Sequence, residues 1–178
     1  YNTKSLKHVT IPFIGSKIDN PATFYEFFVC ESLESIKLTN CNYLKNSTFR
    51  NMKDLKEVII MGDLTDIPDN AFEGCESLQS VEFSDSVVQI GSSAFKDCFD
   101  LRSFTLNEDF EQIRSSAFEN CYRLWEVYNY SEFVITAGAE NSNAGNIGMY
   151  AIKVHTSEDS EPVVYETIND VYYFGYVD

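Results

Sequence analysis

The apolar residues of this chain recur with a period of 23 positions. From Ile67 onward the same pattern appears three times: an isoleucine, an Ala-Phe pair, a cysteine, a leucine and then a short alternating run. The middle copy, residues 90–106, reads IGSSAFKDCFDLRSFTL. A period of this length is typical of a solenoid, in which a unit that cannot bury its apolar face alone buries it against its neighbours.

Each copy changes its internal spacing partway along. The slots from Ala94 to Leu101 fall at i, i+1, i+4 and i+7, as on one face of a helical turn. Phe104 and Leu106 alternate with polar residues, as in a half-buried strand. With weaker copies before Ile67 included, the sequence predicts an α/β fold: a solenoid that winds as a right-handed β-α superhelix of about six coils of 22–23 residues. We expect a parallel sheet on one face, short helical turns on the other and a β-rich C-terminal cap.

Stacking of the coils places equivalent residues in columns along the solenoid axis. The phenylalanine column is predicted to be a buried aromatic ladder, and the cysteine column includes a methionine, Met52. Because a thioether suits an apolar pocket and forms no disulfide, we interpret these cysteines as buried free thiols, with an inter-coil disulfide or a metal site as the alternatives. Cys41 lies outside the column and is either a surface thiol or a buried loop residue. The two columns consist of Phe27, Phe49, Phe72, Phe95 and Phe118, and of Cys30, Cys75, Cys98 and Cys121.

Three segments are predicted along the chain. Residues 1–130 form the solenoid, and residues 131–161 form a capping segment and linker, with a strand expected within 149–154. Residues 162–178 are rich in β-branched and aromatic side chains and are expected to form a β-hairpin, either packed on the cap or beginning a further domain.

The charge balance excludes two classes of partner. Lys and Arg total 13 and Asp and Glu total 28, so the net charge is -15. This charge repels a nucleic-acid backbone or an anionic membrane surface, and no apolar run approaches the ~18 residues that span a bilayer. We therefore expect no nucleic-acid partner and no membrane insertion. Because the chain begins at Tyr1, we expect it to be a piece of a longer protein.

Candidate catalytic and metal-binding residues are few. The two histidines, His8 and His155, lie at opposite ends of the chain, and the common catalytic and phosphate-binding motifs are missing from the sequence. A Cys41–His8 dyad and a weak Ca²⁺ site at the aspartates of residues 63–69 are the alternatives left open. We predict that the chain is not an enzyme and uses no cofactor and no metal.

The outward residues of the strands form the surface on which a solenoid of this shape offers a ligand-binding site. Most are small or polar, which is typical of a solvated face. Apolar and aromatic side chains interrupt this face, and tyrosine is enriched at binding hot spots. The candidate ligand-binding residues are Lys37, Ile59, Glu82, Thr105, Tyr128 and Tyr130.

The three copies resemble the BspA-like, or treponemal-type, class of leucine-rich repeats, whose unit has the spacing I-x-x-x-A-F-x-x-C-x-x-L-x-x-V-x-F. The resemblance is strong over residues 30–130 and weaker over residues 1–29. It implies an extracellular or cell-surface protein whose partners are host matrix glycoproteins, glycans or bacterial surface proteins. It favours a non-enzymatic binding or adhesion module. The alternative is a structural spacer within a larger surface protein, with no ligand of its own.

Overall fold

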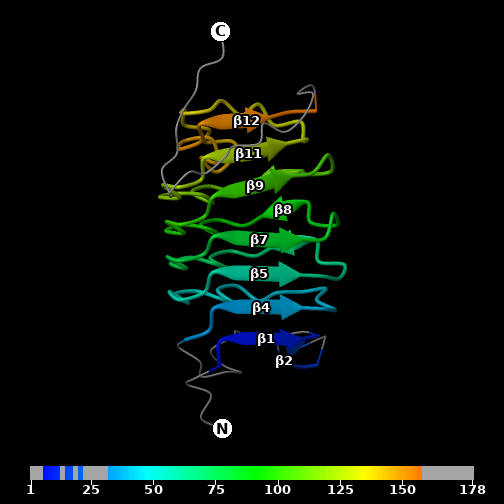
Figure 1. The fold of residues 1–178 in the computed structure, drawn as a ribbon. Helices are drawn as coiled ribbons and strands as arrows, with labels where there is room; N and C mark the ends of the chain where they lie inside the picture. The colour runs from blue at the N-terminus through cyan, green and yellow to red at the C-terminus, as the bar shows by residue number, and fades with distance from the viewer. Residues whose placement is uncertain (1–5, 13–14, 18–19, 22–31, 158–178) are drawn as a thin grey trace.

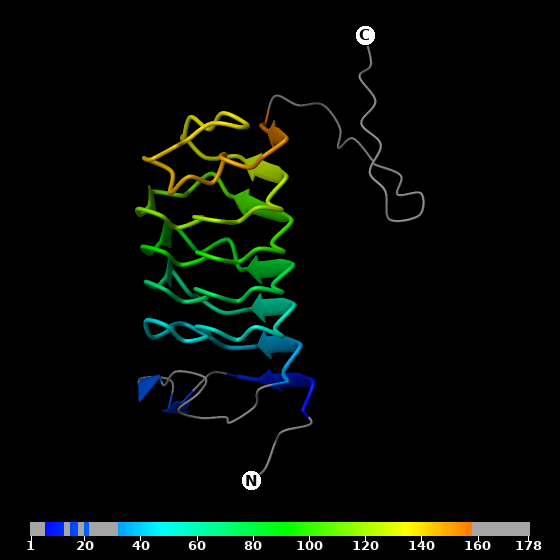
Figure 2. The same cartoon turned by 90° about the vertical axis from the view of Figure 1, so that its left-hand side faces the viewer.

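The computed structural model describes residues 6–12, 15–17, 20–21 and 32–157. Over these residues the chain winds into a solenoid whose coils lie one above another (Figures 1 and 2). Phe27, Cys30 and the hairpin predicted at residues 162–178 lie outside the described residues. The boundaries of the three predicted segments stay predictions.

One face of the solenoid carries parallel strands in register, as predicted, but they form two sheets. The first sheet has the order β1 (His8–Ile11), β4 (Ser35–Leu38), β5 (Glu57–Ile60) and β7 (Ser80–Phe83). The second has the order β12 (Lys153–His155), β11 (Glu126–Asn129) and β9 (Ser103–Leu106). The ladder is interrupted between β7 and β9, which stand visibly farther apart than the other neighbouring strands (Figure 1).

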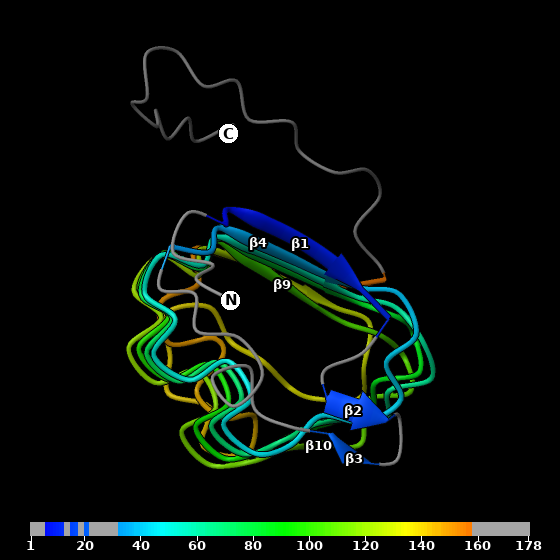
Figure 3. The same ribbon diagram turned by 90° about the horizontal axis from the view of Figure 1, so that it is seen from below.

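A second line of pairing lies on another side of each coil. The two-residue strands β6 (Asp66–Ile67), β8 (Gln89–Ile90) and β10 (Gln112–Ile113) form a three-stranded parallel sheet. An isolated bridge from Ile113 to Ala144 continues it into the last coil. Seen along the axis, the coils superimpose. The sheet of β6, β8 and β10 lies on a different side of the core from the strand face that carries β4 and β9 (Figure 3). Near the N-terminal end, β2 (Gly15–Lys17) pairs antiparallel with β3 (Asn20–Pro21).

The predicted helical turns are wrong, because the described residues contain no helix. Two residues that flank each core phenylalanine have positive φ, such as Ser93 at 54° and Asp97 at 61°. The backbone N–H groups of Ser93, Phe95 and Asp97 donate to carbonyl oxygens of the following coil, at 3.1, 2.8 and 2.9 Å. In an α-helix these groups would bond within their own segment. The apolar spacing is therefore that of a turn built around left-handed residues.

The aromatic ladder is confirmed for the four described phenylalanines. The rings stack nearly parallel, with centroids 5.0, 5.1 and 5.3 Å apart and interplanar angles of 16°, 6° and 9°. All four side chains are fully buried. The ladder runs without a break through the coils, so the core is continuous even where the strand face is not. Its members are Phe49, Phe72, Phe95 and Phe118.

The cysteine column is also confirmed over the described residues, where Cys75, Cys98 and Cys121 are buried and free. Each thiol donates to the phenylalanine carbonyl oxygen 26 residues earlier, at 3.0, 3.2 and 3.1 Å. Burial raises the pKa of Cys75 to about 12 and also raises the pKa values of Cys98 and Cys121. These side chains fill space in the core and satisfy a carbonyl oxygen of the preceding coil.

Cys41 is buried in a loop, which decides between the two alternatives for this residue. Its thiol donates to the carbonyl oxygen of Tyr43 at 3.4 Å, and burial raises its pKa to about 11.

A divergent last coil follows β11 and ends in β12. The strand predicted within residues 149–154 is shorter and lies later, at Lys153–His155. Gly145 lets this coil approach its neighbour. Its φ is +59°, and a Cβ atom there would lie 2.7 Å from the Cβ atom of Ala117. The N–H group of Phe118 donates to the carbonyl oxygen of Gly145 at 3.0 Å, so the inter-coil ladder continues into this coil.

The buried columns predict that two substitutions in the same coil lower the free energy of unfolding by very different amounts. Phe95→Ala should lower the free energy of unfolding by about 3–5 kcal/mol, since it removes a ring stacked on both sides. Cys98→Ala should cost much less, because it removes one sulfur atom. Urea unfolding of the two variants and the parent measures both costs, and equal costs would contradict the ladder as the main packing element.

The raised pKa values predict thiols that do not react in the folded protein. At about pH 8.5, Cys75, Cys98 and Cys121 should be alkylated on the order of 1000-fold more slowly than in urea, because both thiolate formation and access are suppressed. Mass spectrometry after brief labelling identifies which cysteine reacts. Rapid native labelling of Cys98 would show that the column is open to solvent.

Candidate binding face

The strand register places five of the candidate residues in one row across the two sheets. Thr10 pairs with Lys37, Lys37 with Ile59, and Ile59 with Glu82. In the second sheet Thr105 pairs with Tyr128, and Tyr128 with His155. We call the paired residues from Thr10 to His155 the outward row. Tyr130 follows β11 and is not part of the row, although its side chain is 47% exposed.

The outward row has a different chemistry in each coil. Glu82 and Thr105 are exposed, whereas Lys37, Ile59 and Tyr128 are half-buried. A cation, an aliphatic group, a carboxylate, a hydroxyl and an aromatic ring therefore follow one another along the solenoid. The buried columns, in contrast, repeat the same residue types.

The C-terminal end of the row is an aromatic pair that sequence reasoning missed. Tyr128 stacks on His155 with ring centroids 4.5 Å apart and planes 9° apart. The Tyr128 hydroxyl donates to Glu126 Oε2 at 2.8 Å, so the ring is held in place from two sides. His155 is buried, and its Nε2 atom has no hydrogen-bond partner among the described residues. The last coil is longer than 23 residues, so the period did not place His155 after Tyr128, and the predicted row ended at Tyr128.

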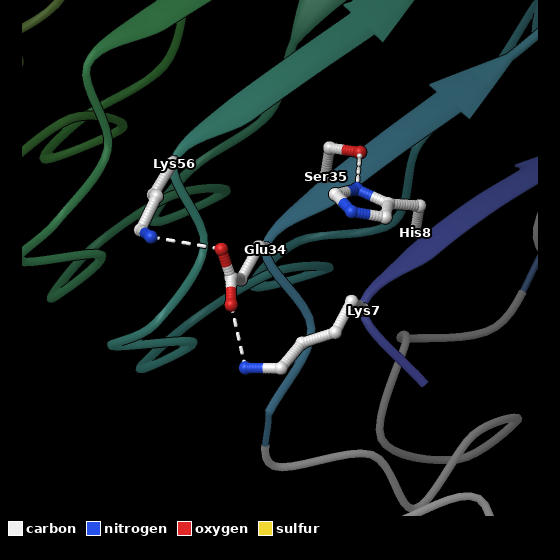
Figure 4. Close-up of polar contacts among 5 residues, drawn as sticks. All are labelled: Lys7, His8, Glu34, Ser35 and Lys56. Carbon is white, nitrogen blue, oxygen red and sulfur yellow. Dashed lines mark hydrogen bonds and ion pairs between the residues drawn. The ribbon is translucent and has the colours of Figure 1, made fainter. Parts of the chain in front are cut away.

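A polar network lies beside the row at the N-terminal end of the face (Figure 4). The Glu34 carboxylate accepts from Lys7 Nζ at 2.5 Å and from Lys56 Nζ at 2.8 Å. Hydrogen bonds from Lys56 and Lys7 lower the pKa of Glu34 to about 2. The His8 Nδ1 atom lies 2.8 Å from Ser35 Oγ. Exposed ion pairs of this kind contribute little stability but tie three consecutive coils together.

The Cys41–His8 dyad left open by the sequence does not form. The Cys41 thiol is buried and bonded to Tyr43, whereas His8 is exposed and bonded to Ser35. The aspartates proposed as a Ca²⁺ site also have other partners, since Asp66 accepts from Thr65 Oγ1 and Asp69 from the N–H group of Ser92. Over the part of the chain that is described, His, Cys, Asp and Glu side chains form no group of three that could hold a metal ion.

Ion pairs between neighbouring coils lie on other sides of the solenoid. They join side chains 23 residues apart, with N to O distances from 2.6 to 3.0 Å. These pairs neutralise basic residues and leave the acidic surplus of the chain in place. They are Arg50–Glu73, Lys53–Glu76, Lys96–Glu119 and Asp100–Arg123.

A cleft of about 350 Å³ lies where the ladder is interrupted, and we call it the β7–β9 cleft. Outward, inward and turn residues all line it, so it passes from the strand face toward the core. It makes Val81 and Phe83 half-buried, whereas the residues in the same slots of nearby strands are fully buried: Val58, Ile60, Leu106 and Val127. Its lining comprises Val81, Glu82, Phe83, Ser84, Asp85, Val87, Phe104, Thr105, Asn107 and Phe110.

Two phenylalanines lie at the interruption of the ladder. Phe83 occupies a slot that holds leucine or isoleucine in nearby strands, and Phe104 occupies a slot that otherwise holds valine or isoleucine. Their rings lie 5.8 Å apart at 55°, and Phe104 also packs edge-on against Phe118 at 4.9 Å. Because the two rings lie in different slots, they meet at an angle and do not stack flat as the rings of the aromatic ladder do. We expect this tilted pair to keep β7 and β9 apart.

Residues 1–125 match the family described as BspA type leucine-rich repeat region, in six copies. Among solved structures, a leucine-rich repeat protein from Bacteroides ovatus is 30% identical, with a TM-score of 0.49 over 70% of this chain and 37% of that chain. A leucine-rich cell surface protein from Faecalibacterium prausnitzii is 21% identical, with a TM-score of 0.59 over 75% of this chain and 35% of that one.

A leucine-rich repeat protein from T. pallidum is 18% identical, with a TM-score of 0.47 over 68% of this chain and 72% of that chain. The chain thus spans little more than a third of the first two proteins. No curated protein matches it. Among the described residues, no helix has the length and apolar character needed to cross a bilayer.

The tilted rings predict that one substitution closes the cleft. Phe83→Leu places in β7 the residue type found in the same slot of β4 and β9, so β7 and β9 should pair and their amides should exchange more slowly with solvent. Hydrogen exchange over residues 80–83 and 103–106 measures this change. Phe110→Leu is the matched control, because Phe110 lines the cleft but lies outside the strands. Unchanged exchange in Phe83→Leu would show that the ring does not separate the strands.

Proposed function

Because this chain belongs to the family of proteins with BspA-type leucine-rich repeats, we propose that it is a non-enzymatic binding module of an extracellular or cell-surface protein. Its partner is a host matrix glycoprotein, a glycan or a bacterial surface protein. The description of the Faecalibacterium prausnitzii relative as a cell surface protein supports this location.

The observation that carries the proposal is the contrast between the inward columns and the outward row. The solenoid is held together by buried side chains of the same type in each coil. The outward row is not needed for this packing and differs in charge and polarity from coil to coil. An extended face with varied chemistry on a rigid frame is the arrangement that repeat proteins use for recognition.

The charge of the chain narrows the class of partner. A net charge of -15 favours cationic or neutral surfaces and opposes nucleic acids and anionic membranes. Both exposed carboxylates at the rim of the β7–β9 cleft, Glu82 and Asp85, add to this preference.

The inter-coil ion pairs favour a second candidate function. Pairs such as Arg50–Glu73 and Lys96–Glu119 join consecutive coils without involving the outward row. Charged side chains that are paired within the solenoid are not available to a partner, as expected of a structural spacer that holds another part of the protein away from a surface, with no ligand of its own.

A binding screen separates the two functions. We expect saturable binding of the chain to at least one member of a panel of immobilised matrix glycoproteins, glycans and whole bacteria at physiological salt. The double substitution Tyr128→Ala/Tyr130→Ala, which changes one residue in the outward row and one just after it, should weaken this binding about tenfold or more, because tyrosines are frequent binding hot spots. Tyr122→Ala is the matched control, since Tyr122 is 51% exposed but lies in a turn away from the strand face.

Two results would count against the binding module. Absence of binding to every member of the panel would support the spacer. Equal losses of affinity in both variants would show that the binding site does not lie on the strand face.

A further inference from the structure

We propose that the β7–β9 cleft binds an extended, basic peptide segment as an added strand, which joins the two sheets of the face into one. This inference rests on the proposed binding function and specifies the chemistry of one partner. It combines three features of the cleft: two facing strand edges, an apolar floor and an acidic rim.

The facing edges carry backbone groups that belong to no ladder. In β7, the N–H group of Ser80 bonds toward β5, at the Lys56 carbonyl oxygen. In β9, the Leu106 carbonyl oxygen accepts from Tyr130, on the side of β11. Because successive residues of a strand direct their backbone groups to opposite sides, Val81 and Phe83 face the gap from β7, and Thr105 faces it from β9. Such edges are templates for pairing with another strand.

Hydrogen bonds between the two coils bridge the cleft at both ends, through the backbone at one end and through a side chain at the other. The N–H group of Arg102 donates to the Gln79 carbonyl oxygen at 3.3 Å, which ties the two coils together just before the strands begin. At the carboxyl ends of β7 and β9, Asn107 Nδ2 donates to the carbonyl oxygens of Asp85 and Val87, at 2.8 and 3.3 Å. A parallel strand would enter at this end, because it would displace only a side chain there and would keep the main-chain bond at the other end. Full pairing on both sides needs β7 and β9 about 9.6 Å apart, twice the normal spacing, so binding widens the carboxyl end of the cleft.

The two sides of an added strand would meet different surroundings. Side chains of a strand alternate between faces, so every second residue of the peptide would point to the apolar floor formed by Phe83, Phe104 and Phe110. The residues between them would point to the exposed side chains of Glu82 and Thr105. A volume of about 350 Å³ lies at the lower end of the range for ligand sites, which suits a short segment.

The negative charge at the rim of the cleft favours peptides with basic side chains. Glu82 and Asp85 are exposed carboxylates, and none of the residues that line the cleft is lysine or arginine. With the net charge of -15, this rim attracts lysine and arginine side chains and repels acidic segments.

The probe is the capped hexapeptide Lys-Val-Thr-Val-Thr-Lys, titrated against the whole chain by calorimetry. We expect saturable binding with a Kd between about 10 µM and 1 mM, together with slower amide exchange in β7 and β9. A peptide N-methylated at both valines should bind at least about tenfold more weakly, because it lacks the two valine N–H donors and its methyl groups obstruct pairing along that edge. A peptide with glutamate in place of both lysines should also bind at least about tenfold more weakly.

Variants of the protein test the site. Phe83→Leu, which closes the gap, should abolish peptide binding while the chain remains folded. Glu82→Gln should weaken binding of the lysine peptide several-fold. Glu57→Gln is the matched control, because Glu57 is an exposed outward residue on β5, away from the cleft, and should leave the affinity unchanged.

Strand addition would be overturned by equal binding of the N-methylated peptide, or by no binding of the lysine peptide at millimolar concentration. If the peptide fails but the glycoprotein and glycan panel still detects binding that depends on Tyr128 and Tyr130, the proposed function stands without strand addition. If both fail, the proposed function fails as well.

Discussion

The inter-coil backbone ladder around the core phenylalanines is the constraint on which the rest of the structure depends. Alternate N–H groups in each turn, such as those of Ser93, Phe95 and Asp97, donate to the next coil. Neighbouring turns are thereby held in register, and equivalent side chains fall into columns. The stacked rings, the thiols that donate to phenylalanine carbonyls and the inter-coil ion pairs all follow from this registration.

The columns were predictable because they depend only on spacing. A 23-residue period fixes which residues stack, and it correctly identified the phenylalanine ladder, the free cysteines and the register of the outward row. The conformation of the turns was not predictable from apolar spacing, since a helical turn and this turn both place Ala94, Phe95 and Cys98 on one side. The signal was in the polar residues, because the positions flanking each phenylalanine carry Ser, Asn, Asp or Gly, which tolerate positive φ.

The candidate site was predictable only in part. The outward row follows from strand alternation, but the β7–β9 cleft depends on two residues that each fit the pattern when taken alone. Phe83 and Phe104 lie 21 positions apart, in different slots of neighbouring coils. The two rings meet at an angle only after the coils are stacked, because stacking brings these different slots together. The place of His155 beside Tyr128 was not predicted for a related reason, since the longer last coil shifts His155 out of the 23-residue frame.

The interruption between β7 and β9 also has a mechanical meaning. A continuous parallel sheet is the stiff side of a solenoid, and here that side is divided, while the aromatic ladder passes the same level unbroken through Phe72, Phe95 and Phe118. At this level the ring stack and the inter-coil bonds of the turns join the two parts of the rod, without strand pairing. Bending away from the strand face would meet no strand-pairing bonds between β7 and β9, whereas every other pair of neighbouring strands on this face would resist it with a ladder. A partner wedged between these strands would fix the angle of the rod and pass force along it.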